Sequence, residues 1–213
     1  MATISGDLHL VNRDTSIMII EELGYPALLQ RCKDMGFKVF ESQDYDLNII
    51  GIRNAEGTVN AFDDEMHVLY LKDGSWHHHC YKCTTDAGLH YLLNPFSRGT
   101  AIVVHDRQYR GVYKLGTHTG YKALSQQGNS IAVWRDRNKD NKHDYTGEID
   151  EGYFGINIHR ANKYKESSLV NNWSAGCQVI ADPRDFDEFI SLCEMQIERV
   201  GSNSFSYTLL FGF

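Results

Sequence analysis

Short runs of alternating apolar and polar residues, separated by turn residues, dominate the chain from Asp46 onward. A period of two residues is typical of half-buried β-strands, whereas a helix repeats every 3.6 residues. The turns between the runs, such as Lys72-Asp-Gly74, contain residues that tolerate a left-handed backbone. Because the runs are short and closely spaced, the sequence predicts an antiparallel sandwich or barrel-like sheet. The expected strands are residues 47–53, 66–71, 101–104, 111–115, 130–134, 153–159 and 205–211.

Helical patterns are expected near the two ends of the chain. Towards the C-terminus, Asp182 and Pro183 precede an apolar stripe of helical period that stops at Gly201. A capping Asp, a Pro in the first turn and a Gly after the last turn are typical helix boundaries. Towards the N-terminus, a short helix is expected between Pro26 and Gly36, and another between Asp14 and Glu22. The predicted fold class is therefore mainly β with a few helices, α+β overall.

The whole chain is expected to form one compact unit. Its 213 residues, of which 42% are hydrophobic, suffice for one core. We expect residues 1–46 to be a helical N-terminal segment packed on a main domain of residues 47–213. The net charge of -7 argues against nucleic-acid binding, which needs a basic face. The sequence has no run of 18 apolar residues, so no membrane span is predicted. We expect a monomer.

Two stretches carry the residue types of an activated thiol. Gly155-Ile-Asn-Ile-His159 places a histidine at the end of an expected strand, and Trp173-Ser-Ala-Gly-Cys177-Gln178 places a cysteine after a Ser-x-Gly turn. An imidazole can take the thiol proton, and a glycine lets the backbone turn tightly enough to direct N–H groups at an oxyanion. A histidine or a cysteine alone is more often structural. Together they predict a catalytic pair.

The two stretches resemble the signature of the YkuD-type L,D-transpeptidase catalytic domain. That signature is a histidine at a strand end, a loop, and then Ser-His-Gly-Cys followed by Arg or Asn. A divergent branch with many phage and prophage members, which reads G-I-N-I-H-R-A and W-S-A-G-C-Q, is more similar still. The similarity covers roughly residues 80–190. The matching positions are His159, Ser174, Gly176 and Cys177, with Ala175 in place of the second histidine of the family and Gln178 in place of Arg or Asn.

The resemblance implies a role for each matching residue. Cys177 is expected to be the nucleophile and His159 the general base, joined as a thiolate–imidazolium pair. Ser174 and Gly176 would shape the turn, and the backbone carbonyl of Arg160 would orient the histidine ring. The N–H groups of Gly176 and Cys177 would form the oxyanion hole. The residues expected to bind substrate are His118, Asp86, Gln178 and Trp173.

The implied reaction is acyl transfer on peptidoglycan stem peptides through a Cys177 thioester, with no cofactor required. Water as the acceptor gives an L,D-endopeptidase or carboxypeptidase, whereas an amine gives an L,D-transpeptidase that forms 3–3 cross-links. The N-terminal residues lack the pattern of a secretory signal. We therefore expect synthesis in the cytoplasm without a signal peptide and action on the cell wall after release or export. This favours a lytic hydrolase such as a phage-encoded endolysin, with a non-catalytic cell-wall-binding module as the alternative.

Two further clusters are candidates for metal binding. One loop places oxygen ligands at alternate positions, as Ca²⁺ requires, although Gly147 stands where a bidentate Glu is expected; the alternative is a surface loop rich in Asx turns. The run His77-His-His-Cys80-Tyr-Lys-Cys83 offers zinc ligands, but a strand would turn residues 77, 79 and 83 to one face and 78 and 80 to the other. We predict a half-buried strand there, with structural zinc as the alternative. The candidate Ca²⁺ ligands are Asp136, Asn138, Asp140 and Asp144.

Overall fold

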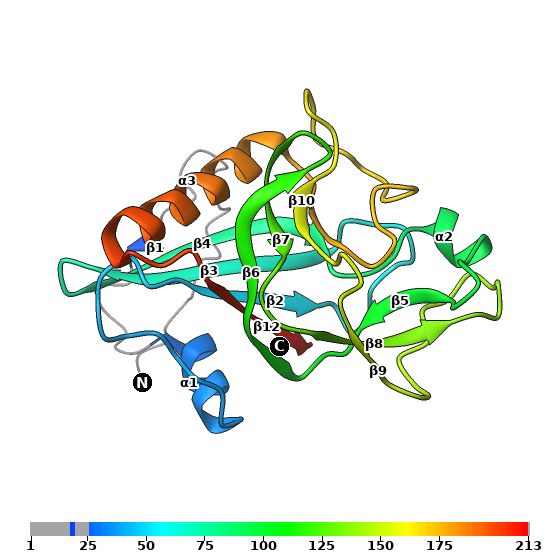
Figure 1. Ribbon diagram of the computed structural model, residues 1–213, viewed down its shortest axis with the longest axis horizontal. Helices are drawn as coiled ribbons and strands as arrows, with labels where there is room; N and C mark the ends of the chain where they lie inside the picture. The colour runs from blue at the N-terminus through cyan, green and yellow to red at the C-terminus, as the bar shows by residue number, and fades with distance from the viewer. Residues whose placement is uncertain (1–17, 20–25, 213) are drawn as a thin grey trace, which may run out of the picture.

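A nine-stranded sheet that closes on itself forms the body of the protein. The computed structural model describes residues 18–19 and 26–212. The strand order is β1-β4-β11-β10-β7-β6-β12-β2-β3, and β3 also pairs with β4, so eight strands close into a barrel-like sheet (Figure 1). A second sheet has the order β5-β8-β9. The strands are β1 Met18–Ile19, β2 Asn48–Arg53, β3 Asp64–Lys72, β4 Ser75–Thr84, β5 Thr100–Val103, β6 Arg107–His118, β7 Tyr121–Gln126, β8 Ile131–Asp136, β9 Asp150–Gly152, β10 Ile158–Arg160, β11 Gln178–Ile180 and β12 Phe205–Phe211.

The mainly β fold class predicted from the sequence is confirmed. The expected strand at residues 153–159 is wrong in its bounds, because only Ile158–Arg160 pairs as a strand there. The side chain of Gln126 on β7 makes hydrogen bonds to the backbone of this segment in place of a paired strand. Its Oε1 accepts hydrogen bonds from the N–H groups of Phe154 at 2.9 Å and Ile156 at 3.1 Å, and its Nε2 donates to the Gly152 carbonyl at 2.8 Å. The backbone before the histidine is therefore satisfied without a neighbouring strand.

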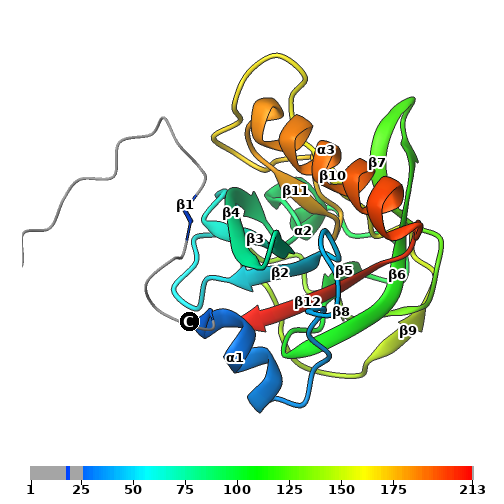
Figure 2. The same cartoon turned by 90° about the vertical axis from the view of Figure 1, so that its left-hand side faces the viewer.

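The long helix α3, Pro183–Val200, begins and ends as predicted. The Asp182 carboxylate accepts a hydrogen bond from the Arg184 N–H at 2.8 Å, and Gly201 ends the helix in a left-handed conformation at φ 74°. The buried stripe of α3 joins the main core, where Phe189 meets the edge of Tyr81 from β4 at 6.2 Å between centroids. Helix α3 lies alongside β10 and β11 (Figure 2), and its packing fixes the position of these two short strands. A shorter helix, α2, spans Leu89–Leu93.

Helix α1, Ala27–Asp34, packs on the outside of the barrel. Leu28, Leu29 and Cys32 are buried against residues of β2, β3 and β12, whereas Met35, expected on the same stripe, is 37% exposed. Helix α1 is the only helix of residues 1–46 that the structure describes, so the predicted helical N-terminal segment stays a prediction. The helix expected between Asp14 and Glu22 lies outside the described residues, except that Met18–Ile19 form β1 and pair with β4.

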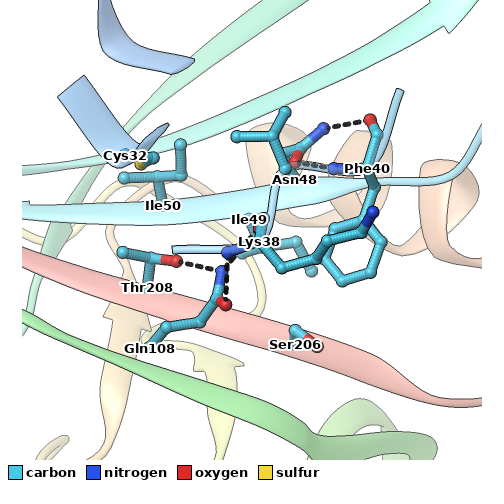
Figure 3. Close-up of a pocket in the computed structure, with 10 residues that line it drawn as sticks. Cys32, Lys38, Phe40, Asn48, Ile49, Ile50, Gln108, Ser206 and Thr208 are labelled. Carbon is cyan, nitrogen blue, oxygen red and sulfur yellow. Dashed lines mark hydrogen bonds between the residues drawn. The ribbon is translucent and has the colours of Figure 1, made fainter. Parts of the chain in front are cut away.

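Two amide side chains, the buried Asn48 and the half-buried Gln108, connect the chain after α1 to the barrel (Figure 3). Asn48 on β2 exchanges two hydrogen bonds of 2.8 Å with the backbone of Phe40. Gln108 on β6 bonds the backbone N–H and carbonyl of Lys38 at 2.9 and 2.8 Å, and also Thr208 at 3.2 Å. The cavity between them measures about 10 Å³, which holds a single water at most. In the part of the chain that the structure describes, no helix is both long and apolar enough to cross a membrane.

Candidate functional site

The pairing of β10 with β11 brings the predicted catalytic residues to one face of the sheet. The two strands are parallel, with His159 opposite Val179 and the Gln178 N–H bonded to the Asn157 carbonyl at 2.9 Å. Cys177, one residue before β11, therefore lies opposite Asn157. Because paired residues point to the same face and alternate residues share it, the side chains of His159 and Cys177 are diagonal neighbours. Among the described residues no hydrogen bond joins the two side chains: the Cys177 sulfur contacts the backbone of Asn157 and Gly155, and the His159 ring contacts Arg160 and Tyr121.

The Ser174 hydroxyl shapes the turn that presents Cys177. Its Oγ accepts a hydrogen bond from the Gly176 N–H at 3.1 Å and donates one to the Cys177 carbonyl at 2.8 Å. Gly176 has a φ of 121°, and a Cβ atom there would lie 2.6 Å from the Ala101 carbonyl oxygen. Only glycine fits this position, because the backbone of β5 approaches it so closely. The Ser174 hydroxyl and the lack of a side chain at Gly176 thus fix the conformation of the turn.

The imidazole of His159 is held in one tautomer. Its Nδ1 lies 2.8 Å from the carbonyl oxygen of Arg160, which can only accept, so Nδ1 carries the proton. The Tyr121 hydroxyl lies 3.4 Å from the same nitrogen and donates to the same carbonyl at 3.3 Å. Among the described residues Nε2 has no hydrogen-bond partner, so its lone pair is available as a base. This is the geometry that the resemblance implied for Arg160.

Burial keeps both groups of the pair neutral in the free protein. The Cys177 Sγ accepts a hydrogen bond from the Asn157 N–H at 3.4 Å, which favours the thiolate, but burial outweighs it and raises the pKa of the thiol to about 11. Burial likewise lowers the pKa of His159 to about 4. A neutral thiol and a neutral imidazole are therefore the favoured resting forms, in place of the expected thiolate–imidazolium pair.

The expected oxyanion hole is reduced to one of its two donors. The Gly176 N–H is engaged by Ser174, so it is not free to bind an oxyanion. The Cys177 N–H has no acceptor among the described residues. It adjoins the sulfur, as an oxyanion donor must. The Cys177 Sγ itself is partly exposed and lies 3.6 Å from the Gly155 carbonyl.

Three other predicted residues lie near His159 or next to the turn in sequence. The ring of His118, at the end of β6, stacks on His159, and its Nδ1 lies 3.1 Å from Asn157 Nδ2. The Arg160 guanidinium lies over the Tyr121 ring at 3.8 Å from its centroid. Trp173 precedes the turn and is 38% exposed. His118, Arg160 and Trp173 are therefore available to a bound ligand.

The structure does not place Asp86 and Gln178 in a substrate groove. The Asp86 carboxylate forms a buried ion pair with Arg53 at 3.0 Å and accepts a hydrogen bond from Tyr145 at 2.8 Å. Gln178 is fully buried, accepts a bond from the Tyr207 hydroxyl at 2.7 Å and donates to the Gly176 carbonyl at 3.2 Å. Asp86 belongs to a charged core network and Gln178 supports the turn from inside. Sequence position alone could not separate these roles from ligand contact.

The predicted Ca²⁺ loop begins at the end of β8. Asp136 is 1% exposed, and neither of its carboxylate oxygens has a hydrogen-bond partner of ordinary geometry among the described residues. Burial and the nearby Asp144 raise its pKa. Asn138 bonds Asp144 at 2.9 Å and, through Oδ1, accepts from the Asp140 N–H at 3.1 Å. The carboxylates of Asp136, Asp140 and Asp144 do not all lie within 4.8 Å of one another, so among the described residues no preformed ligand cluster is present in this loop, and Ca²⁺ binding there stays a prediction.

Sequence reasoning missed two residues of the site, Asn157 and Tyr121. Asn157 donates its N–H to the sulfur and its amide to His118. Its position two residues before His159 on an expected strand was a signal, because alternate strand residues share a face. Tyr121 contacts the Arg160 carbonyl from β7, a strand that the sequence pattern did not predict.

Comparison of the chain with protein-family models, with curated proteins and with solved structures found no match in any of the three. The assignment of function therefore depends on the geometry of the site and on the resemblance of its motifs.

Proposed function

We propose that the protein is a cysteine-dependent enzyme that transfers acyl groups of peptidoglycan stem peptides, with water as the acceptor. The observation that carries the proposal is the orientation of His159. Its Nδ1 is fixed by the Arg160 carbonyl at 2.8 Å, and its Nε2 is left on the face that presents the Cys177 sulfur. The YkuD-like motifs supply the substrate class.

The reaction starts from the neutral pair. As the Cys177 sulfur attacks the carbonyl carbon of an L-to-D peptide bond, its proton passes to Nε2 of His159. The Cys177 N–H stabilises the oxyanion. The imidazolium then protonates the leaving amine, and the C–N bond breaks to give a thioester. Water, deprotonated by the neutral imidazole, hydrolyses the thioester and restores the thiol.

The Arg160 carbonyl stabilises the imidazolium without a buried carboxylate. A charged His159 costs free energy in this dry position, and the carbonyl dipole at Nδ1 offsets part of the cost. The same contact occupies Nδ1, so Nε2 is the nitrogen left free to act as the base. His159 is therefore a base that gains its proton in the transition state.

Mass spectrometry of defined muropeptides tests the proposal. Disaccharide tetrapeptides and cross-linked dimers are incubated with wild type, with Cys177→Ala and with Gln30→Ala, an exposed change on α1. Shortened or split muropeptides from wild type and Gln30→Ala, and none from Cys177→Ala, are the expected result. New 3–3 cross-linked dimers would instead show that the acceptor is an amine and not water. Full wall binding with no product from any variant would contradict an enzyme and favour the binding module.

The proposed site of action is the cell wall. Release or export from a cytoplasm in which the chain is made remains part of this proposal, as does a phage origin. Adding the purified protein to intact and to permeabilised bacteria tests it: lysis only after permeabilisation is expected of an enzyme that reaches the wall from inside.

A further inference from the structure

Three side chains of the metal-binding type meet on the outer face of the barrel, on the two strands that close it. Glu65 and His67 lie on β3, and Cys80 lies on β4 directly opposite His67 in the antiparallel register. One oxygen, one nitrogen and one sulfur of these residues all lie within 4.8 Å of one another. Each side chain occupies an alternate strand position, so the three share one face by the geometry of the sheet.

His67 is the centre of the cluster. Its Nε2 lies 2.9 Å from Glu65 Oε2 and 3.9 Å from Cys80 Sγ. The ring of His67 is 8% exposed, whereas Glu65 and Cys80 are exposed at its rim. One ring nitrogen, one carboxylate oxygen and one sulfur therefore lie close together at the rim of the barrel.

A second histidine, His78, contacts the ring nitrogen of His67 that points away from the cluster. Nε2 of His78 lies 2.7 Å from Nδ1 of His67, and the two rings stack with centroids 5.0 Å apart. Histidines that bind metals commonly donate the N–H of their other nitrogen to a hydrogen-bond acceptor, which fixes the tautomer and the ring orientation. His78 is placed to accept that N–H from His67.

We propose that Glu65 Oε2, His67 Nε2 and Cys80 Sγ bind a Zn²⁺ ion, with His78 orienting His67. Oxygen, nitrogen and thiolate sulfur are the ligands of zinc in proteins, and three protein ligands leave a fourth position open to water. A harder cation such as Ca²⁺ or Mg²⁺ would not select the sulfur and nitrogen. A carboxylate and a thiolate together balance the charge of the ion.

The histidine run on β4 contributes to this site only through its outward positions. His79 and Cys83 are buried on the opposite face, in agreement with the strand alternation expected from the sequence. The other ligands come from β3, so the CxxC spacing plays no part. Sequence reasoning missed the site because its decisive pair, His67 and Cys80, is defined by strand register.

Zinc binding has a defined proton balance. The ordinary pKa of a cysteine thiol, about 8.5, lies above 7, so at pH 7 the thiol of Cys80 carries its proton before metal binds. His67 binds the ion as a neutral imidazole. His67 and His78 then need only exchange tautomers, the proton of His67 moving to Nδ1. The bond formed is Zn–S, the S–H proton passes to the buffer, and nothing is oxidised or reduced.

Cobalt substitution in the full-length chain tests the proposal. The experiment uses a Cys177→Ala background in reducing buffer, because the remaining cysteines, Cys32, Cys83 and Cys193, are buried. Stoichiometric Co²⁺ should give visible tetrahedral bands and a near-ultraviolet thiolate-to-cobalt band, and Zn²⁺ should displace both. Cys80→Ser should abolish the thiolate band, and His67→Ala should weaken Zn²⁺ affinity at least tenfold. His78→Ala should weaken it about 10- to 100-fold.

His77→Ala is the matched control. His77 is the same residue type on the same strand, but its ring stacks on Tyr70. The proposal is overturned if His77→Ala reduces Zn²⁺ affinity as much as His67→Ala does, or if the thiolate band survives Cys80→Ser. Calorimetry in buffers of different ionisation enthalpy gives an independent readout: release of about one proton per Zn²⁺ at pH 7. A heat of Zn²⁺ binding without proton release would contradict thiolate ligation. Unchanged melting of metal-free Cys80→Ser and His67→Ala shows that the variants fold.

Discussion

The imidazole rings of His118 and His159 stack in parallel, with centroids 4.2 Å apart and planes inclined by 10°. His118 comes from the end of β6 and His159 from β10, so two distant parts of the chain meet at the proposed base. The Asn157 amide, at 3.1 Å, holds His118 in this position. The stack adds a second restraint on the His159 ring, beside the Arg160 carbonyl at Nδ1.

Replacing His118 should therefore separate stacking from proton transfer. We expect His118→Ala to lower kcat about tenfold, because the His159 ring loses one of its two restraints, whereas His118→Phe keeps most of the activity. Steady-state hydrolysis of a defined muropeptide measures both variants. Equal losses in the two variants would show that His118 acts through its nitrogens.

The pH dependence of Cys177 alkylation by iodoacetamide should be that of a thiol with a raised pKa. Since burial raises this pKa to about 11, the alkylation rate in the free protein is expected to climb through pH 8–10 without a plateau at acidic pH. Peptide mapping by mass spectrometry distinguishes Cys177 from Cys80. A rate that stays high and constant from pH 5 to pH 8 would instead indicate a resting thiolate–imidazolium pair.

Stability should fall as the pH decreases from about 6.5 to about 4. His159 has an ordinary pKa of 6.5, lowered by burial to about 4 in the folded protein, so the unfolded chain binds the extra proton across this window. The effect amounts to about 3 kcal/mol at most. Urea unfolding of His159→Gln should show a shallower pH dependence, whereas the exposed His90→Gln keeps the wild-type dependence. Some dependence remains because burial also lowers the pKa of His78 to about 4.

Gly176→Ala should be strongly destabilising. Its φ of 121° and the 2.6 Å approach of a Cβ to the Ala101 carbonyl oxygen require a shift of the turn, at a cost of about 3 kcal/mol. Gly120→Ala is the control, because Gly120 also has a positive φ, 90°, but no atom within 4 Å of the added Cβ. That change should cost about 1–2 kcal/mol. Urea midpoints of the two variants test the difference, and equal midpoints would contradict the close approach.

Ca²⁺ should stabilise the wild-type chain through the loop after β8. Asp136 is buried without an ordinary hydrogen-bond partner, so a bound cation would satisfy its carboxylate. The melting temperature should rise with Ca²⁺ and return with a chelator. Asp136→Asn should remove the response, while Asp187→Asn, an exposed change on α3, should keep it. An identical response in both variants would place the ion elsewhere.

Elements with strong boundary residues could be predicted from the sequence. Asp182, Pro183 and Gly201 define α3 locally, and the alternating apolar residues of β12 define that strand without reference to its partners. The strand β7, Tyr121–Gln126, was missed because its residues have few β-branched side chains and its stability comes from pairing with β6 and β10. Sequence patterns thus sufficed to predict the elements whose boundaries are determined by neighbouring residues.

The candidate site could be predicted in part for the same reason. The turn Ser174 to Cys177 is encoded in four consecutive residues, and His159 stands at a strand end as expected. The burial of Asp86 could not be predicted, because it depends on Arg53, which lies far away in sequence. The neutral state of Cys177 and His159 likewise depends on tertiary burial, which no spacing expresses.

The place of β12 in the sheet bears on how the molecule is made. This strand is the last of the described strands, yet it lies between β2 and β6 and joins the first half of the barrel to the second. During synthesis the barrel therefore stays open until β12 has left the ribosome, even after the turn carrying Cys177 has emerged. Such non-local closure is slow compared with local hairpin formation. A nascent chain is thus expected to acquire its reactive thiol geometry only after translation of the final strand.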